Sequence, residues 1–147
     1  MFQGEYSVSL DAKGRLAIPT DFREPIAREC GDELMLTYNG FDNSCLWLYP
    51  RGVWEEVRDE VMGLTNFYPQ HRQMQRRLVG AARSVSPDGS GRIQLPVHHR
   101  QVAALEKKVI FMGMGSKFEI WNEEALNRDR FETPQGEPTE EMIRLKI

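Results

Sequence analysis

The sequence has little cysteine and no long apolar run. Its 147 residues include only two cysteines, Cys30 and Cys45, without the C-x-x-C spacing of metal or redox sites. Such a count is typical of free thiols in a reducing compartment. No stretch approaches the roughly 18 to 20 apolar residues that span a bilayer, and residues 1–5 lack the basic and apolar segments of a secretory signal. We therefore expect a cytoplasmic protein with no membrane partner.

Catalytic motifs are also missing. There is no G-x-S-x-G elbow, no H-E-x-x-H helix and no complete Walker A loop. Residues 113–117, Gly-Met-Gly-Ser-Lys, lack the Walker spacing and join two expected strands. His98 and His99 are adjacent, and neighbouring side chains seldom converge on one metal ion. The sequence predicts no enzyme, catalytic residue, metal site, cofactor or small-molecule substrate. The alternative of a small hydrolase or nucleotide-binding enzyme would require nucleotide binding that depends on Lys117.

Basic residues are slightly outnumbered by acidic ones and unevenly distributed along the chain. The formal net charge is −3, yet residues 70–100 contain six arginines and one aspartate, whereas residues 122–141 are mainly acidic. Binding to a polyanion depends on the local surface more than on the net charge. The basic tract therefore allows nucleic-acid binding, and the alternative of two ordinary solvated faces stays open.

A ten-residue pattern occurs twice. Residues 10–19 (LDAKGRLAIP) return as residues 87–96 (PDGSGRIQLP), so that Arg92 follows Arg15 by 77 positions. Weaker matches continue downstream, between residues 34–37 and 109–112 and between residues 45–49 and 117–121. A half of about 50 residues buries too little surface to be stable alone. We expect the two halves to interlock or to associate with other chains.

The hydrophobic pattern predicts strands with short helices between them. Apolar and polar residues alternate in residues 6–10 and 16–18, as in half-buried strands on both sides of a turn. Pro87 lacks an amide donor and should end the strand before the second turn early. A short helix capped by Thr20 or Asp21 should follow the first turn and be limited by Pro25. Further strands are expected at 33–38 and 44–49, with helices at 54–64, 74–81 and 122–131 and a tail with a short helix after Thr139.

The repeated Asp-x-x-Gly-Arg turn is the candidate functional element. Gly14 supplies the positive φ that such a turn needs, and an arginine at a hairpin tip can contact phosphate or the O6 and N7 acceptors of guanine. The alternative is structural: Arg15 pairs with Asp11, and its counterpart Arg92 pairs with the second aspartate. One arginine could do both. Because Lys13 has a serine as its counterpart, we expect the first turn to make more phosphate contacts.

Several motifs together resemble the bacterial MraZ family. They are the opening Met-Phe-x-Gly-x-Tyr, the first Asp-x-x-Gly-Arg turn, residues 45–50 (CLWLYP), and Arg76-Arg77-Leu78 before the second turn. The match covers about residues 1–130. The resemblance implies an α+β, mainly β fold similar to AbrB and SpoVT, with two pseudo-symmetric swapped-hairpin halves forming one small β-barrel core flanked by helices. The implied boundaries are 1–50 and 81–122 for the two repeats, 51–80 for a helical connector and 123–147 for a C-terminal helix and tail.

The same resemblance implies the function. MraZ-like proteins are sequence-specific, DNA-binding transcriptional regulators, cytoplasmic and nucleoid-associated, that assemble into ring-shaped homo-oligomers. They repress their own division and cell-wall gene cluster by binding direct repeats in double-stranded promoter DNA. Carried onto this sequence, the DNA-contacting residues are Asp11, Lys13, Gly14, Arg15 and Arg92. The alternative function is an antitoxin-like, protein-interaction module that acts through the acidic tail.

Overall fold

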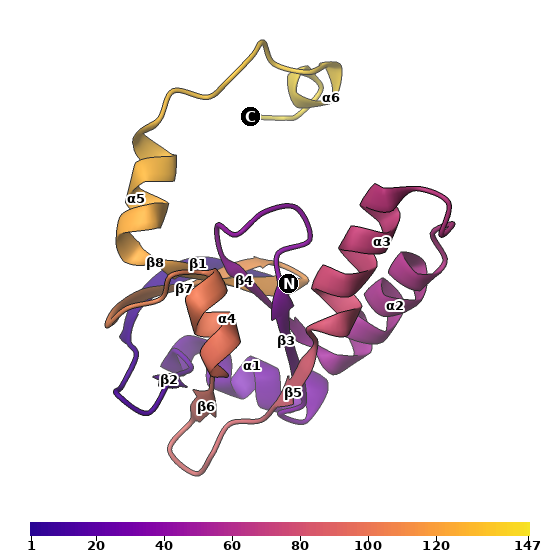
Figure 1. Cartoon of the computed structure of the whole chain (residues 1–147). Helices are drawn as coiled ribbons and strands as arrows, with labels where there is room; N and C mark the ends of the chain where they lie inside the picture. The colour runs from indigo at the N-terminus through magenta and orange to yellow at the C-terminus, as the bar shows by residue number, and fades with distance from the viewer.

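The computed structural model describes residues 1–147 and shows an α+β fold that consists mainly of sheet with surrounding helices (Figure 1). Six antiparallel strands form one sheet in the order β1-β7-β8-β4-β3-β5, and β2 pairs with β6 in a separate two-stranded sheet. The strands are β1 (Phe2–Ser9), β2 (Arg15–Ala17), β3 (Leu34–Tyr38), β4 (Leu46–Pro50), β5 (Arg83–Val85), β6 (Arg92–Gln94), β7 (Lys108–Gly115) and β8 (Lys117–Asn122). The helices are α1 (Thr20–Cys30), α2 (Arg51–Met62), α3 (Pro69–Gln75), η1 (Arg76–Gly80), α4 (Val97–Val102), α5 (Glu123–Phe131) and α6 (Glu140–Ile143).

Both sheets are shared between the two sequence repeats. The first strand of each repeat pairs with a later strand of the other, β1 with β7 and β5 with β3. The short strands β2 and β6 pair with each other, as do β4 and β8. Neither repeat therefore completes a sheet by itself, and the expected interlocking of the halves is confirmed.

The predicted closed barrel is wrong. The six-stranded sheet is open, because β1 and β5 are its two edges and do not pair with each other. One physical cause is the shortness of β5, which spans three residues against eight in β1. The strand ends at Val85, before Pro87, whose nitrogen has no hydrogen to donate to a ladder. The expected early end of this strand is confirmed, and it leaves that edge too short to continue the ladder.

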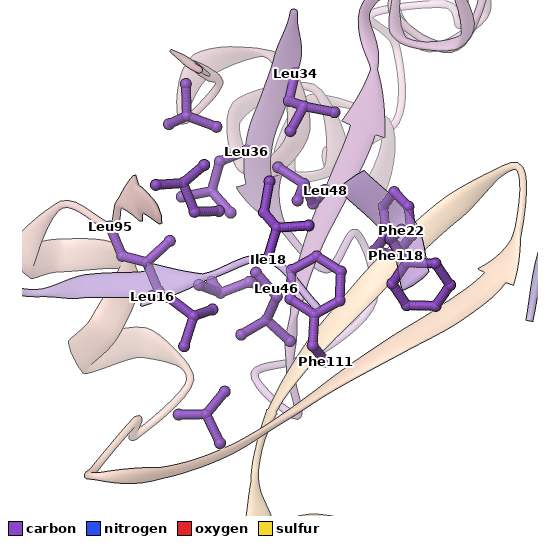
Figure 2. Packing of buried hydrophobic residues seen from close by; sticks show 14 of the residues in the cluster. Leu16, Ile18, Phe22, Leu34, Leu36, Leu46, Leu48, Leu95, Phe111 and Phe118 are labelled. Atoms are coloured by element: carbon purple, nitrogen blue, oxygen red, sulfur yellow. The ribbon is translucent and has the colours of Figure 1, made fainter. Parts of the chain in front are cut away.

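One face of the large sheet contains the main hydrophobic core. Seventeen buried residues form this cluster, and most come from the large sheet, from α1 and from the small β2–β6 sheet with the residues that directly follow its strands. Figure 2 shows Leu16 and Leu95 in the same interior as Leu46 and Phe111. The rings of Phe22, Phe111 and Phe118 lie within 6 Å of one another, centroid to centroid. This core holds the β2–β6 sheet against the large sheet.

The opposite face carries a second core of nine buried residues. In β4, Leu46 and Leu48 belong to the first core, whereas Trp47 and Tyr49 belong to the second. Alternate residues of a strand point to opposite faces, so β4 is buried on both sides. Helix α2, the η1 turn and α5 supply the covering residues, which are Trp54, Val61, Leu78 and Leu126.

Helix α1 differs from the expectation both in its length and in its N-terminal cap. Pro25 lies inside the helix and does not shorten it, since the helix continues to Cys30. A proline removes one backbone donor, and burial of Phe22 and Ile26 against the core holds the helix in place. The predicted side-chain cap is also absent, because Pro19 occupies the cap position and Asp21 instead accepts a 2.6 Å hydrogen bond from the Tyr6 hydroxyl.

The connector and the tail contain the expected helices, but the second connector helix begins at Pro69, before the predicted start at residue 74. Helix α2 and the continuous α3–η1 segment lie between the repeats, and α5 begins after Asn122, whose side chain caps it. Beyond α5 the chain leaves the body of the molecule and ends in α6 (Figure 1). None of the helices combines the length and the apolar character required to cross a membrane. Cys30 is half-buried and Cys45 buried, and both thiols are free, as predicted.

Candidate nucleic-acid interface

The pairing of β2 with β6 brings the two repeated turns together. Leu16 lies opposite Ile93 in this small sheet, and both side chains are fully buried. Burial of these residues fixes the register, because a shift by one position would turn them toward solvent. In that register Arg15 lies opposite Gln94, and Arg92 lies opposite Ala17. The loops that precede the two strands sit on the same end of the molecule (Figure 1).

The first turn is organised by the carboxylate of Asp11. Its Oδ1 accepts hydrogen bonds from the backbone amides of Lys13 and Arg15, both at 2.9 Å. Its Oδ2 accepts a 2.8 Å bond from Nε of Arg15, so the ion pair and the turn share one aspartate. The amide of Gly14 donates to the Asp11 carbonyl at 3.0 Å, and the φ of Gly14 is +80°. The aspartate therefore sets both the loop and the direction of the guanidinium.

The second turn repeats this scaffold with a looser ion pair. The amides of Ser90 and Arg92 donate to Oδ1 of Asp88 at 2.8 and 3.1 Å. Gly91 adopts a φ of +75° and donates its amide to the Asp88 carbonyl. Nε of Arg92 is 3.6 Å from Oδ2 of Asp88 and has no hydrogen-bond partner. The backbone of the turn is thus reproduced, while the arginine is less tightly held.

Both arginines lie beside an aspartate and remain partly exposed. The side chain of Arg15 is 33% exposed and that of Arg92 is 36% exposed. Nη1 of Arg92 also lies 3.9 Å from Oδ2 of Asp11, so this carboxylate is adjacent to both guanidinium groups. The arginines are therefore oriented by aspartates and still reach solvent.

The two aspartates are held in their charged form. Hydrogen bonds from the Arg15 amide and side chain and from the Lys13 amide lower the pKa of Asp11 below its ordinary value of 3.8. The amides of Arg92 and Ser90 and the charge of Arg92 lower the pKa of Asp88 in the same direction. Hydrogen bonds to the ionised form of a carboxyl favour that form. Both turns therefore keep their aspartates ionised at neutral pH.

The tip of the first turn carries a free cation. Lys13 is exposed and forms no ion pair, whereas its counterpart Ser90 is neutral. The carbonyl of Lys13 accepts a 2.7 Å hydrogen bond from the side-chain amide of Gln94 in the other repeat. The position equivalent to Gln94 in the first repeat is Ala17, which has no polar side chain to offer. The first turn is therefore both more basic and better anchored.

Sequence reasoning missed two arginines beside the turns. Arg23 in α1 contacts the second turn at Gly91, and Arg100 in α4 contacts the first turn at Gly14. Both lie outside the Asp-x-x-Gly-Arg motif, so the motif did not indicate them. Arg100 follows Arg23 by the same 77 positions that separate the turns, and this spacing is the signal that could have revealed them.

Two other arginines of the basic tract bind backbone carbonyls of loops. Arg77 binds the backbone carbonyls of Asn39 and Asp42, and Arg72 binds the carbonyl of Asn66. Their guanidinium groups therefore hold loops in place. Among the other sequence candidates, His99 is buried and its Nε2 lies 2.8 Å from the Ala81 carbonyl. Lys117 begins β8 and lies over the Trp47 ring at 4.5 Å from its centroid.

Comparison with known proteins agrees with the repeat. The family model described as "MraZ protein, putative antitoxin-like" matches this chain twice, over residues 1–77 and 78–141. A protein of Stenotrophomonas maltophilia named "Transcriptional regulator MraZ" is 48% identical over 125 residues, which cover 85% of this chain and 84% of that protein. The chain belongs to the MraZ family.

Other MraZ proteins show the same extent of similarity. The "Transcriptional regulator MraZ" of Xylella fastidiosa strain Temecula1 is 47% identical over 125 residues, with 85% of this chain and 84% of that protein covered. The protein of the same name from Marinobacter nauticus is 42% identical over 126 residues, which are 86% of this chain and 84% of its own. MraZ membership thus rests on nearly the whole chain, and it places this chain in a family of transcriptional regulators.

Proposed function

We propose that this chain is a DNA-binding transcriptional regulator that contacts double-stranded DNA through its two paired turns. The observation that carries the proposal is the β2–β6 pairing, which sets two half-exposed arginines from distant parts of the chain side by side. The exposed Lys13 lies on the same end of the molecule. MraZ relatives named transcriptional regulators support a role of this kind.

The chemistry of the turns suits a DNA groove. An arginine fork held by a carboxylate can donate two parallel hydrogen bonds to phosphate or to O6 and N7 of guanine. In this proposal Arg15 and Arg92 make such contacts, Lys13 contacts phosphate, and Gly14 permits the turn. Asp11 acts through Arg15, because all its hydrogen bonds are directed into the turn. A negatively charged side chain in this place orients the cation without facing the phosphates itself.

The architecture proposed with this function is a pair of AbrB-like swapped hairpins. Residues 1–50 and 81–122 would be the two pseudo-symmetric repeats, residues 51–80 the helical connector and residues 123–147 the C-terminal helix and tail. The exchange of first strands between the repeats supports this division. The double match of the family model also supports it, although its own boundary falls between residues 77 and 78.

A ring of subunits would explain how so small a cationic surface binds one promoter. Direct repeats require readers in the same orientation, which neighbours in a heterologous ring supply and a two-fold dimer does not. Linking several weak sites can raise the overall affinity by about two to four orders of magnitude. We propose that such a homo-oligomer binds direct repeats in its own promoter and represses the division and cell-wall genes downstream, in the cytoplasm and at the nucleoid.

The direct test is a titration of the labelled DNA segment upstream of the gene over a range of salt concentrations. Arg15→Ala should weaken binding by about 1–3 kcal/mol and relax the sequence preference. Arg92→Ala should have an effect of the same kind. Arg58→Ala in α2 is the matched control, because Arg58 is also an exposed arginine with one acidic neighbour. Equal binding by the Arg15→Ala and Arg58→Ala proteins would reject this interface.

The ring has its own test. Duplexes with one and with two direct repeats should differ in affinity by about 10² to 10⁴ if several subunits bind together. A salt-matched, scrambled second repeat serves as the control duplex. Equal affinity for the single and the tandem site would reject the multivalent arrangement while leaving the contact residues in place.

A second candidate function is favoured by the C-terminal segment. Residues 132–147 are exposed throughout and include four large apolar side chains, namely Met142, Ile143, Leu145 and Ile147. An exposed, partly acidic segment that stands clear of the body (Figure 1) suits an added, antitoxin-like role in protein binding. Truncation after Phe131 should then remove a protein partner in pull-down experiments and spare promoter binding. If truncation removes promoter binding as well, the tail serves the DNA-binding assembly instead.

A further inference from the structure

Each turn is covered by an arginine from the other repeat. A Cβ atom at Gly14 would lie 2.7 Å from Cζ and 2.8 Å from Nε of Arg100. A Cβ atom at Gly91 would lie 2.6 Å from Nε and 2.7 Å from Cζ of Arg23. Real Cβ atoms do not approach heavy atoms so closely, so the guanidinium groups rest directly on the glycine backbone. The glycines are thus required for this contact as well as for their positive φ.

Each of these arginines is fixed by a backbone hydrogen bond. Nε of Arg100 donates to the Leu95 carbonyl at 3.0 Å, and Nε of Arg23 donates to the Ile18 carbonyl at 2.9 Å. Leu95 and Ile18 also bind the turn of the other repeat through their backbone amides. Leu95 donates to the Gly14 carbonyl at 2.8 Å, and Ile18 donates to the Gly91 carbonyl at 2.9 Å. Arginine, strand end and opposite turn therefore form one connected unit on each side.

Neither Arg23 nor Arg100 is paired with a carboxylate. Arg15 and Arg92 lie next to aspartates, whereas no acidic side chain comes within 4.0 Å of the charged nitrogens of Arg23 or Arg100. Each guanidinium therefore brings an uncompensated positive charge to a turn. Their planar shape also suits contact with a peptide plane, which a lysine ammonium cannot reproduce.

We propose that Arg100 and Arg23 are positioning residues that act crosswise, Arg100 of the second repeat on the first turn and Arg23 of the first repeat on the second turn. Arg100 holds the first turn against the end of β6, and Arg23 holds the second turn against the end of β2. The arginine of each turn is thereby presented in one orientation. The consequence for DNA affinity rests on the function proposed above. The crosswise contact itself does not depend on DNA.

Hydrogen–deuterium exchange of the free protein tests the contact. Arg100→Ala should increase the exchange of amides in residues 11–16 by about two- to tenfold relative to those in residues 88–93. Arg23→Ala should do the reverse. Arg100→Lys and Arg23→Lys keep the charge and most of the bulk, and they should show the same pattern because lysine has no Nε fork. Equal changes in both turns, or a change in the turn of the same repeat, would overturn the proposal.

A double-mutant cycle tests the consequence for binding, with the labelled upstream duplex as the probe. Arg100→Ala and Lys13→Ala should be non-additive, with coupling of about two- to tenfold in affinity, whereas Arg23→Ala and Lys13→Ala should be additive. A general loss of protein stability would give the same coupling in both pairs of variants. If the wild-type protein binds no duplex yet shows the crosswise exchange pattern, the DNA proposal fails and the positioning role stands. If it binds DNA and the two cycles are alike, the positioning role fails.

Discussion

The two turns share one backbone and differ in what they present. Asp11 and Asp88 make the same pair of amide contacts, and each turn has a glycine at positive φ. The first turn adds an exposed lysine and a side-chain anchor from the other repeat, whereas the second has a serine and no such anchor. The repeat has thus kept the scaffold in both copies, while charge is concentrated in one. The difference locates the stronger proposed DNA contact in the first turn.

Substitutions in the core that both turns share should have the largest effect on the free energy of unfolding. Leu16 and Ile93 face each other in the small sheet and are both fully buried. Leu16→Ala and Ile93→Ala should each lower the free energy of unfolding by about 2–5 kcal/mol, because each leaves a cavity in a closed core. Urea denaturation of the two variants measures this. Markedly unequal losses would break the equivalence of the two halves, and Met62→Ala in the exposed part of α2 is the control with little expected effect.

Exchange of the tip residues sharpens the contrast in charge. Lys13→Ser should weaken duplex binding and reduce the slope of log affinity against log salt by about one, since one phosphate contact is lost. The reciprocal Ser90→Lys should increase the slope by about the same amount. Titrations at several salt concentrations give both values. A Lys13→Ser protein with an unchanged slope would show that this lysine does not contact phosphate.

The anchor on the first turn has a smaller effect. Gln94→Ala removes the hydrogen bond to the Lys13 carbonyl and should lower the free energy of unfolding by about 0.5–1.5 kcal/mol. Ala17→Gln, at the matching place in the first repeat, is the comparison variant, because it offers an amide to the second turn. Thermal or urea unfolding measures both. If Gln94→Ala has no effect on stability or on duplex affinity, the asymmetry of anchoring is without consequence.

Acid should weaken both turns by a small and similar amount. The pKa values of Asp11 and Asp88 are lower in the folded protein than their ordinary value of 3.8. The stabilising contribution of each is therefore complete above pH 3.8 and is lost as the pH falls through the folded pKa. Asp11→Asn and Asp88→Asn should each flatten the decline of the unfolding free energy below about pH 4. A decline unchanged in both variants would contradict these shifts.

Much of the fold follows from local patterns. Period-two alternation predicted β1 and β2, and the helical spacing of Trp54 and Val61 predicted α2. The small size of the halves predicted that they interlock or associate with other chains, and the strand pairing shows that they interlock. The open sheet could not be predicted in this way. Closure depends on whether β1 and β5 pair, and such long-range pairing leaves no local pattern in the sequence. The length of α1 was missed since burial of Phe22 and Ile26 outweighs the lost donor of Pro25.

The candidate site shows a similar division. The repeated motif predicted both turns and left the ion pairs open, and the structure shows that Arg15 is paired and half-exposed at once. The adjacency of Arg15 and Arg92 required the β2–β6 pairing, which joins residues 77 positions apart. The contacts of Arg23 and Arg100 with the glycines required three-dimensional packing as well. Sequence spacing identifies equivalent residues, but it does not show which copy they contact.

Photo-cross-linking to the upstream duplex tests the central claim that the paired turns face DNA together. Ala12 and Gly89 are equivalent, exposed tip positions, and a photoreactive residue at either one leaves Lys13 and both arginines intact. Position 59 in α2, also exposed, is the control site. The paired-turn interface predicts cross-links to DNA from positions 12 and 89 and none from position 59. Cross-links from position 59 alone, or from none of the three with the duplex bound, would contradict it.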